Sequence, residues 1–428
     1  MMRFVVVGAG WSGLAAATFL QENGHDVTVF EAASHVGGRI ATSAAHGGLV
    51  EHGPHGVFDR GAPAKLAELA GVELVAAPQR APRFVVQGGV LVPVLLCPPG
   101  ILATPLLHGS AKLRLLAEPL VPRARQDESI ADLTRRRLGP DVLPLLDAMV
   151  GGIHAGDPTR LSARHAFPRI WAMDQGKGVL RTIAAARNPP ARLVAPRQGM
   201  QGWMQALAER LDVRLDEPAK AIFTDAGVLV ETTRAKIPAD AVIVALDPLA
   251  TAGLLGIQVP PPPVAPVTIV TFTVEADKAP HEGYGYLAPE GEHRFLLGAL
   301  YESVLFPGRA PAGQALVRCF VGGRRHPKRA HLSDDELIAT AWQELKDLDL
   351  VGGQPMDASV IRTAGIPQLE LGHERWLSAL PSNGLVHTIG IGHRGVGLEA
   401  LAEEAYHLAR KLSPAPQSPA NLPHPAAG

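Results

Sequence analysis

The sequence has little cysteine, no excess of charge of either sign and no long apolar run. Its 428 residues include two cysteines, Cys97 and Cys319, which lie far apart and predict neither a metal site nor a disulfide framework. Such cysteine usage is typical of a reducing compartment. The sequence contains 40 basic and 41 acidic residues, which gives a net charge of −1. Charge therefore gives no reason to expect nucleic-acid binding.

No uninterrupted apolar segment is long enough to cross a bilayer. The richest stretch, residues 90–107, is interrupted by prolines. Three interpretations of it stay open: packed core, the lip of a hydrophobic channel, or a surface that rests on a membrane. With 46% hydrophobic residues, the chain is long enough to form two or three domains.

The amino terminus carries a strand, a glycine turn, a helix and a second strand. A first apolar run leads into Gly8, Gly10 and Gly13, a helix is predicted at residues 14–23, and a second apolar run is closed by Glu31. Gly8 allows a tight turn, Gly10 lets the backbone approach a pyrophosphate, and Gly13 lets the helix pack on the strand. The helix N-terminus then faces the phosphates. The pattern predicts a dinucleotide site, and Glu31 would accept hydrogen bonds from ribose and repel the 2′-phosphate of NADP.

A second glycine pair, Gly37 and Gly38, is followed at once by Arg39, and a further glycine-containing segment occupies residues 51–56. Backbone amides and a guanidinium suit a long, doubly charged pyrophosphate, which favours FAD over NAD. The alternative is a surface turn with a solvated arginine. A cleavable signal peptide is not expected, because the first apolar run is already the nucleotide-binding strand.

A helix-rich region follows residue 100. Helices are predicted at residues 111–117 and 129–138, the second with Ser129 as its N-cap. The basic run from Arg135 to Arg137 is predicted to be a solvated face near the negative end of that helix.

Later apolar runs predict two sheets. Residues 241–246 are continuously apolar, as is typical of a buried parallel strand, so the nucleotide-binding domain is expected to resume there. Residues 267–274 and 315–321 indicate a second, antiparallel sheet. Helices are predicted at residues 204–211 and 334–348.

A set of short segments, spread along the chain, carries a further pattern. They are residues 118–119, 128–129, 151–158, 161–162, 167–168, 306–311, 366–368, 372–373 and 395–398. Together these segments resemble the protoporphyrinogen oxidase family, flavoenzymes of late haem biosynthesis. The resemblance covers nearly the whole chain, up to about residue 412.

The resemblance implies an α/β fold with three interleaved parts. A Rossmann-like FAD-binding domain of the glutathione-reductase type would comprise residues 1–78, 196–260 and 360–412. An antiparallel-sheet substrate domain would comprise residues 79–93 and 261–359. Residues 94–195 would form a helical domain of a kind that lies against a membrane in many members. The Pro/Ala-rich tail, residues 413–428, is expected to be disordered.

The activity implied is oxidation of a porphyrinogen to a porphyrin, with O2 reoxidising the flavin and giving hydrogen peroxide. Protoporphyrinogen IX and coproporphyrinogen III both stay open as substrates. The expected location is the cytoplasm, with peripheral contact at the cytoplasmic face of a membrane as an alternative. A homodimer and transfer of the product to a ferrochelatase are further expectations of the resemblance.

The residues carried over to FAD cluster at both ends of the chain. They are Gly8, Gly10, Trp11, Ser12, Gly13, Glu31, Gly38, Arg39, Gly53, Pro54, His55, Gly56, Ala219, Ile391, Val396, Gly397 and Leu398. A backbone group at Ala219 would pair with adenine, and residues 396–398 would open a helix, predicted at residues 399–411, whose N-terminus stabilises the reduced flavin. No protein acid, base or nucleophile stands out, since the flavin carries the chemistry.

A porphyrinogen is a large apolar macrocycle with carboxylates, so its site needs apolar walls and a cationic anchor. By resemblance, Arg83 pairs with a propionate and Gly156 makes a backbone contact. Leu287, Leu300 and Phe320 would sandwich the rings. The alternatives are a surface arginine and ordinary sheet core.

Several positions depart from the family pattern. Ile391 lies where relatives often have Asn, Leu369 and His393 where they often have Tyr, and Glu399 with its neighbour where Asn-Asp is usual; a typical Trp near Thr363 is missing. These changes are expected to cluster on the flavin side of the pocket. They keep open a noncatalytic flavin- or tetrapyrrole-binding paralogue.

An FAD amine oxidase is the less favoured alternative. Such an enzyme needs an aromatic cage beside the flavin, but residues 361–398 contain Trp376 and no tyrosine or phenylalanine.

Overall fold

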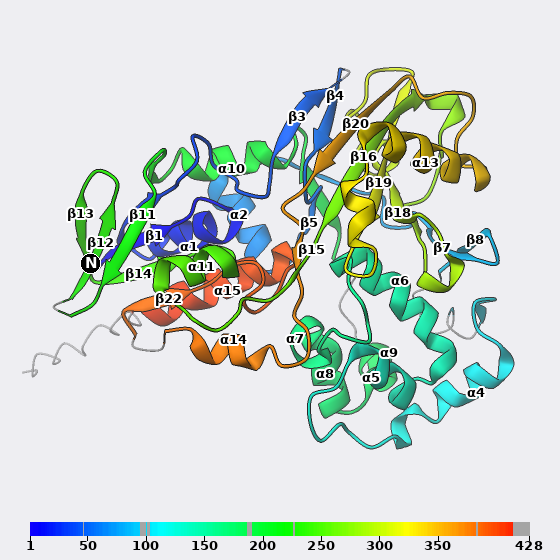
Figure 1. Ribbon diagram of the computed structural model, residues 1–428, viewed down its shortest axis with the longest axis horizontal. Helices are drawn as coiled ribbons and strands as arrows, with labels where there is room; N and C mark the ends of the chain where they lie inside the picture. Colours follow the sequence, from blue (N-terminus) through cyan, green and yellow to red (C-terminus); the bar gives the residue numbers. More distant parts are fainter. Residues whose placement is uncertain are drawn as a thin grey trace, which may run out of the picture.

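The computed structural model describes residues 1–45, 47–94, 100, 103–185, 191–225, 227–381 and 384–413. Cys97 and the predicted tail beyond residue 413 lie outside them. Figure 1 shows three regions: a sheet with its helices at the left, a second sheet at the upper right, and a helical lobe, residues 103–185, at the lower right. Blue, green and red segments meet in the left-hand region, so distant parts of the chain build it together.

The left-hand region is built on a five-stranded, wholly parallel sheet of order β10-β2-β1-β14-β22. Its strands are β1 (Arg3–Val7), β2 (Asp26–Phe30), β10 (Asp212–Arg214), β14 (Ala241–Val244) and β22 (Val386–Thr388). Every residue of β14 is buried, and Val242 pairs with Val5 of β1. The predicted return of the chain to this sheet near residue 241 is therefore confirmed.

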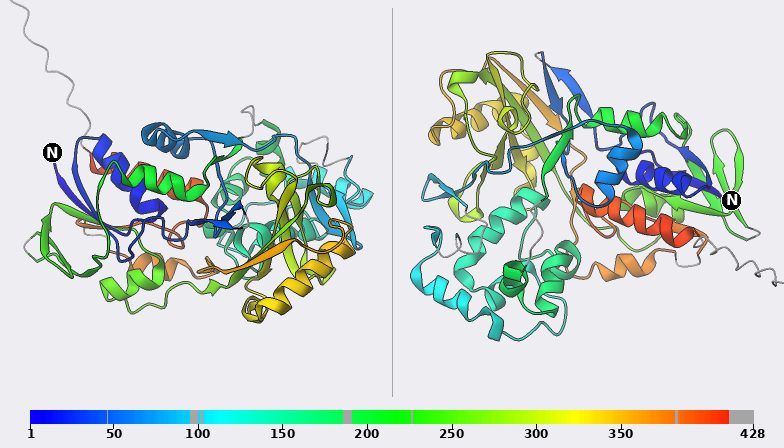
Figure 2. Two further views of the ribbon diagram at one scale, coloured as in Figure 1. Left: turned by 90° about the horizontal axis from the view of Figure 1, so that it is seen from above. Right: turned by 180° about the vertical axis from the view of Figure 1, so that it is seen from behind.

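Three helices pack side by side against this sheet (Figure 2): α1 (Trp11–Glu22), α10 (Met200–Ala208) and α15 (Leu398–Leu412). α1 begins directly after Gly10, three residues earlier than predicted. The bounds predicted for a helix at residues 204–211 are wrong, because α10 begins at Met200 and ends at Ala208. Met200 donates its N–H to the Glu51 carboxylate at 2.9 Å, so a residue distant in sequence caps the start of α10.

The upper right region is a seven-stranded sheet of order β20-β16-β19-β18-β17-β7-β8. Its strands are β7 (Arg83–Gln87), β8 (Val90–Pro93), β16 (Val267–Glu275), β17 (Gly285–Leu287), β18 (Leu296–Tyr301), β19 (Gln314–Gly322) and β20 (Asp357–Arg362). The predicted antiparallel sheet is confirmed, except that β17 and β7 are parallel. Helix α13 (Asp334–Asp347) covers one face, and Ser333 and Glu336 form a capping box at its start.

The helical lobe contains α4 (Gly109–Leu116), α5 (Ile130–Arg137), α6 (Leu143–His154), α7 (Ala163–Ala166), α8 (Pro168–Gln175) and α9 (Val179–Ala185). Ser129 caps α5 as predicted, accepting the Asp132 N–H at 3.1 Å. The prediction that Arg135 to Arg137 form a solvated face is wrong for Arg137, which is 2% exposed. Its guanidinium lies 2.6 Å from Asp174 and 3.3 Å from Glu118, acids that only the tertiary fold brings near.

Smaller elements join these regions. They are β3 (Thr42–Ala45), β4 (Gly48–Glu51), β5 (Val57–Phe58), α2 (Ala62–Ala70), β6 (Leu74–Ala76), β9 (Leu193–Pro196), β11 (Ala219–Phe223), β12 (Val228–Thr232), β13 (Lys236–Ala239), α11 (Pro248–Leu255), β15 (Val264–Ala265), α12 (Glu302–Leu305), β21 (Ile366–Pro367) and α14 (Glu374–Ala379).

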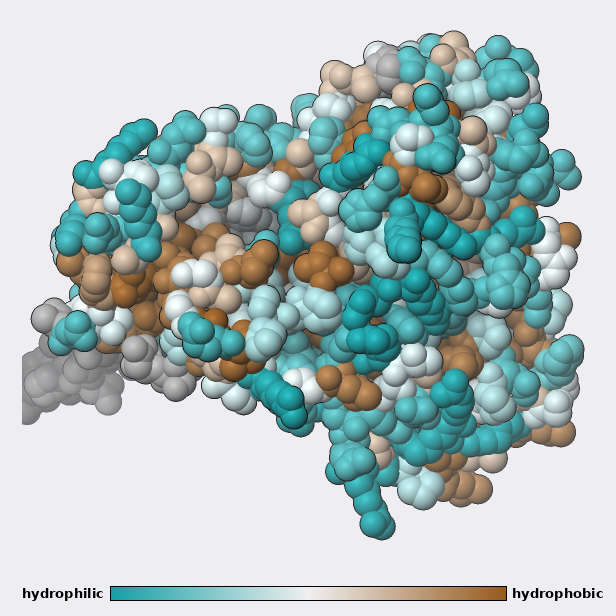
Figure 3. All heavy atoms as spheres, in the orientation of Figure 1, coloured by the Kyte–Doolittle hydropathy of each residue, from teal (hydrophilic) through white to brown (hydrophobic). Residues whose placement is uncertain are grey.

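The proline-interrupted stretch divides between two environments. Val90 on the edge strand β8 is 60% exposed, whereas Leu106 and Leu107 are buried in the helical lobe. Within the described ranges, no helix is both long enough and apolar enough to cross a membrane. On the face seen in Figure 3, apolar side chains show in separate groups among hydrophilic ones.

Candidate functional site

The two glycine turns lie against each other. Gly10 and Gly37 form a parallel bridge, and Gly37 donates its N–H to the Ala9 carbonyl at 2.9 Å. Gly8 has φ +103°, and a Cβ there would lie 2.8 Å from the Ala245 carbonyl oxygen. Gly10 is the N-cap of α1, and no side chain caps the helix. The first amides of α1, at Trp11 and Ser12, are therefore not satisfied by a side chain, and they fit a pyrophosphate.

Glu31 is held at the carboxyl end of β2. Its carboxylate accepts the N–H of Ala9 at 2.7 Å and that of Ala33 at 2.9 Å. The Glu31 carbonyl also accepts the N–H of Glu217, two residues before Ala219. The acid predicted to bind ribose and the segment predicted to meet adenine thus lie side by side, as a dinucleotide requires.

Arg39 lies next to the second predicted flavin segment. A Cβ on Gly53 would collide with the Arg39 carbonyl oxygen, so residues 53–56 run close beside it. The guanidinium itself lies 3.3 Å from the Asp247 carboxylate and also donates to the Gly365 carbonyl. It is paired within the protein rather than directed at the glycine turns.

The carboxy-terminal motif converges on the amino-terminal one. The Trp11 indole donates to the Leu398 carbonyl at 2.9 Å, and Gly397, the N-cap of α15, has no side-chain cap. A Cβ on Gly392 would touch Pro248, the residue after the Asp247 that pairs with Arg39. Ile391 packs against the same hydrophobic core as Trp11. Both ends of the chain therefore face one site.

A buried ionic network joins residues 51–56 to α12 and β19, and sequence reasoning missed it. Its members are Glu51, His55, Glu302, Arg309 and Arg318. Arg309 lies 3.1 Å from Glu51 and also pairs with Glu302. His55 Nδ1 lies 3.0 Å from Glu302. No local pattern could have revealed the network, because its members come from β4, α12, β19 and intervening loops.

This network fixes the backbone of the segment predicted to bind the flavin. Arg318 donates to the carbonyls of Glu51 and Gly53 at 2.9 and 3.0 Å. Burial alone would raise the pKa of Glu302, but His55 and the two arginines hold that pKa well below its ordinary value. Glu302 is thus a buried carboxylate that fixes His55 in place.

Four of the five predicted substrate residues, Arg83, Leu287, Leu300 and Phe320, share one face of the seven-stranded sheet. Val86, Tyr286 and Ala299 pack toward α13. Because side chains alternate along a strand, Arg83, Leu287 and Leu300 face the opposite way. Across neighbouring strands, Gly285 pairs with Arg83 on one side and with Leu300 on the other. Gly298 pairs in the same way with Leu287 and Phe320.

These residues contact all three regions. Leu300 packs against the core of the parallel-sheet region, and a Cβ on Gly152 of α6 would meet Leu287. The Arg83 guanidinium stacks on the Tyr284 ring, 4.3 Å from its centroid, and burial raises the pKa of Tyr284 to about 12. Gly156 follows the end of α6 in sequence, and a Cβ there would lie 2.8 Å from the Gln368 side chain.

Two departures from the family pattern lie in the core. Leu369 and His393 are both fully buried. His393 Nδ1 accepts the Trp376 indole N–H at 3.1 Å, and its Nε2 lies 3.0 Å from the Leu246 carbonyl. Burial lowers the pKa of His393, and likewise that of His154, to about 4. Both rings are neutral at pH 7 and serve packing.

Comparisons with known proteins agree with this geometry. The family of flavin-containing amine oxidoreductases matches residues 11–379. Protoporphyrinogen oxidase 2 of Arabidopsis thaliana is 30% identical over 83% of this chain and 82% of its own length. Coproporphyrinogen III oxidase of Bacillus subtilis is 25% identical over 92% of this chain and 94% of its own.

Solved structures share the fold. A putative protoporphyrinogen oxidase from Exiguobacterium superposes with a TM-score of 0.79 at 24% identity, covering 96% of this chain and 98% of that one. A putrescine oxidase superposes with a TM-score of 0.71 at 18% identity, covering 96% and 98%. The chain therefore belongs to the flavin-containing amine oxidoreductase family, as an FAD-dependent oxidoreductase of the protoporphyrinogen oxidase group.

Proposed function

We propose that this protein is an oxidase that converts a porphyrinogen to the corresponding porphyrin in haem biosynthesis, with O2 as the final electron acceptor. The observation that carries the proposal is the position of Leu300. Leu300 and Arg83 both pair with Gly285, one from each neighbouring strand. Leu300 also packs against the core that contains Trp11 of the nucleotide turn. A cationic anchor and an apolar wall therefore adjoin the flavin motif.

The five-stranded sheet is assigned to FAD, the seven-stranded sheet to the substrate, and the helical lobe to one wall of the substrate site. The amides of the glycine turns would hold the pyrophosphate, and Glu31 would hold the ribose. When bound, FAD would accept a hydride, and with it two electrons, in each oxidation step of the substrate. Arg83 would pair with a propionate, while Leu287 and Phe320 keep water from the macrocycle.

The purified protein should be yellow and should form fluorescent porphyrin from protoporphyrinogen IX or coproporphyrinogen III in air faster than autoxidation. Initial rates on the two compounds identify the substrate. An anaerobic experiment is the decisive one: either porphyrinogen should bleach the flavin absorbance. A flavin that stays oxidised with both would instead support a noncatalytic binding protein.

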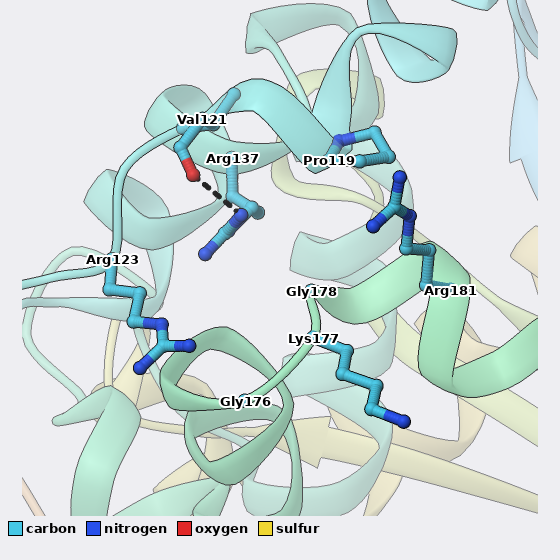
Figure 4. A pocket seen from close by; sticks show the side chains of 8 residues that line it. All are labelled: Pro119, Val121, Arg123, Arg137, Gly176, Lys177, Gly178 and Arg181. Atoms are coloured by element: carbon cyan, nitrogen blue, oxygen red, sulfur yellow. Dashed lines mark hydrogen bonds between the residues drawn. The ribbon is translucent and has the colours of Figure 1, made fainter.

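We also propose that the helical lobe touches an anionic membrane. A pocket of about 330 Å³ in this lobe is lined by Pro119, Val121, Arg123, Arg137, Gly176, Lys177, Gly178 and Arg181 (Figure 4). Arg123, Lys177 and Arg181 are exposed and have no ion-pair partner among the described residues. Leu113, Leu116 and Leu120 nearby are 69%, 64% and 84% exposed. Apolar side chains beside unpaired cations suit a lipid surface.

Vesicle sedimentation tests this contact. The protein should bind vesicles that contain phosphatidylglycerol, and Lys177→Glu combined with Arg181→Glu should abolish binding. Lys220→Glu, an exposed lysine on β11, is the matched control. Equal binding by all three proteins would reject the contact.

A further inference from the structure

Three side chains that commonly bind metals converge where the helical lobe meets the carboxy-terminal part of the chain. Asp127 precedes α5, His165 lies on α7, and Glu374 is the first residue of α14. One ligand atom from each lies within 4.8 Å of the other two. Figure 1 shows α7 and α14 beside each other at this junction. The two segments are joined directly, since Ser162 donates its N–H to the Leu369 carbonyl at 3.0 Å.

The imidazole of His165 packs edge-on against the His373 ring and directs its Nε2 atom toward Glu374. Its Nε2 atom is buried and lacks a hydrogen-bond partner among the described residues, and 12% of the side chain is exposed. The Glu374 carboxylate lies 3.5 Å from this nitrogen. Buried polar atoms are rarely left unsatisfied. A metal ion between the nitrogen and the two carboxylates would satisfy it.

One of the three ligand spacings matches that around a small divalent ion. With bonds of about 2.0–2.2 Å, neighbouring ligand atoms of tetrahedral zinc lie about 3.3–3.6 Å apart. The separation of 3.5 Å between His165 and Glu374 falls in this range. One imidazole and two carboxylates favour a transition metal such as Zn²⁺ over Mg²⁺ or Ca²⁺, which prefer oxygen ligands alone.

Asp127 is held in place by neighbours that leave it able to bind. Its carboxylate accepts the Ser162 hydroxyl at 2.6 Å and the Arg164 N–H at 3.2 Å. Hydrogen bonds of this kind orient metal-binding carboxylates. The Arg164 guanidinium lies 3.9 Å from Glu374, too far for a hydrogen bond, so it leaves that carboxylate accessible.

We propose that Asp127, His165 and Glu374 bind one divalent transition-metal ion of the Zn²⁺ class, with water completing its coordination. The ion would clamp the helical lobe to α14. None of the three residues belongs to the nucleotide turns, and the proposal needs no step of the oxidase reaction. Sequence reasoning predicted no metal, because the three ligands are widely separated and form no motif.

Isothermal titration of the FAD-loaded protein with ZnCl2 tests the proposal. We expect one strong site per chain, and a higher melting temperature with Zn²⁺ than without. His165→Gln and Glu374→Gln should each weaken that site roughly tenfold or more and remove the thermal shift. His407→Gln, which removes an exposed histidine beside a single carboxylate, is the matched control and should change neither result. MgCl2 should give no comparable site.

Co²⁺ gives a second readout, because a tetrahedral site produces visible absorption bands that His165→Gln should remove. Glu374 is 44% exposed, so Glu374→Gln should fold even if the histidine variant does not. FAD content and circular dichroism check the fold of each variant. Zn²⁺ binding of equal strength in wild type and in Glu374→Gln, or no strong site in the wild type, would overturn the proposal.

Discussion

At the scale of single residues, Arg83 illustrates how a side chain gains its role from its neighbours. The sequence places it in a short β segment with nothing local to mark it as an anchor. In the fold, its guanidinium stacks on Tyr284, and it lies on the sheet face with Leu287 and Leu300. Stacking fixes the cation without neutralising it, so the charge stays available for a carboxylate.

Arg83→Ala should therefore raise KM for the porphyrinogen about tenfold or more, since a charge-assisted hydrogen bond contributes about 1.5–3 kcal/mol. FAD content should not change, because the arginine does not touch the nucleotide turns. Arg80→Ala, an exposed arginine in the preceding turn, is the control for loss of charge. Steady-state kinetics on both variants check this. A KM in Arg83→Ala equal to that of the wild type would show that Arg83 is not the anchor.

Glu302 should make stability depend on pH. Its pKa is held below the ordinary value of 4.5 in the folded protein. Its contribution to the free energy of unfolding is thus complete above about pH 4.5 and is lost as the pH falls toward the folded pKa. Glu302→Gln should lose about 3–5 kcal/mol at neutral pH, because buried Arg318 loses its carboxylate partner and Arg309 keeps only Glu51.

Denaturant unfolding at several pH values measures this effect. The loss of stability below pH 4.5 should be smaller in Glu302→Gln than in the wild type. Glu73→Gln, which removes an exposed carboxylate with no ion-pair partner among the described residues, should behave like the wild type. A Glu302→Gln protein as stable as the wild type at neutral pH would contradict the structural role of the network.

At the scale of elements, the contact between α1 and α15 joins the two ends of the chain. Its polar link is the hydrogen bond from the Trp11 indole to the Leu398 carbonyl. Trp11→Phe keeps most of the apolar packing but removes this bond, so we expect a loss of about 1 kcal/mol in the free energy of unfolding. FAD should also bind more weakly, because the starts of α1 and α15 both face the predicted flavin site.

Trp171→Phe is the matched control for this change, since Trp171 lies half-buried in the helical lobe. Flavin release measured by fluorescence compares the variants. FAD affinity that falls equally in both would show that the Trp11 bond has no special part.

At the scale of the whole molecule, Glu370 connects three regions. It accepts Arg160 of the helical lobe at 2.8 and 3.0 Å, and Arg324 beyond β19 at 2.7 Å. Its own segment follows β21 and leads to α14. Arg160 and Arg324 overcome the effect of burial and hold the pKa of Glu370 below its ordinary value, so the links are present at neutral pH.

Glu370→Gln should loosen these regions relative to one another while the core of each stays folded. We expect a loss of only about 1 kcal/mol, because Arg160 is half exposed and its ion pair is screened. Amide exchange should nevertheless rise near residues 158–162 and 322–326. Asp59→Asn, which removes an acid paired with half-exposed Arg192 outside both segments, is a control. Unchanged exchange at both segments would argue that packing alone holds the regions together.

Local pattern was sufficient wherever a residue's role depends on its near neighbours. The glycine turn before α1, the Ser129 cap and the buried strand near residue 241 were all predicted correctly, because turn geometry, capping and apolar runs act over a few residues. The start of α10 was missed because the Glu51 carboxylate, distant in sequence, caps it. Arg137 was misassigned for the same reason, since the acids that bury it come from other elements.

The sequence by itself determined the nucleotide turn, the elements that flank it and the family, because those features depend on contiguous residues and their spacing. Tertiary structure decided which charges meet: the network at residues 51–56, the junction at Glu370, and the convergence of Asp127, His165 and Glu374. Electrostatic partners act over a few ångströms in space, whatever their separation along the chain. Only the folded chain can bring such partners together.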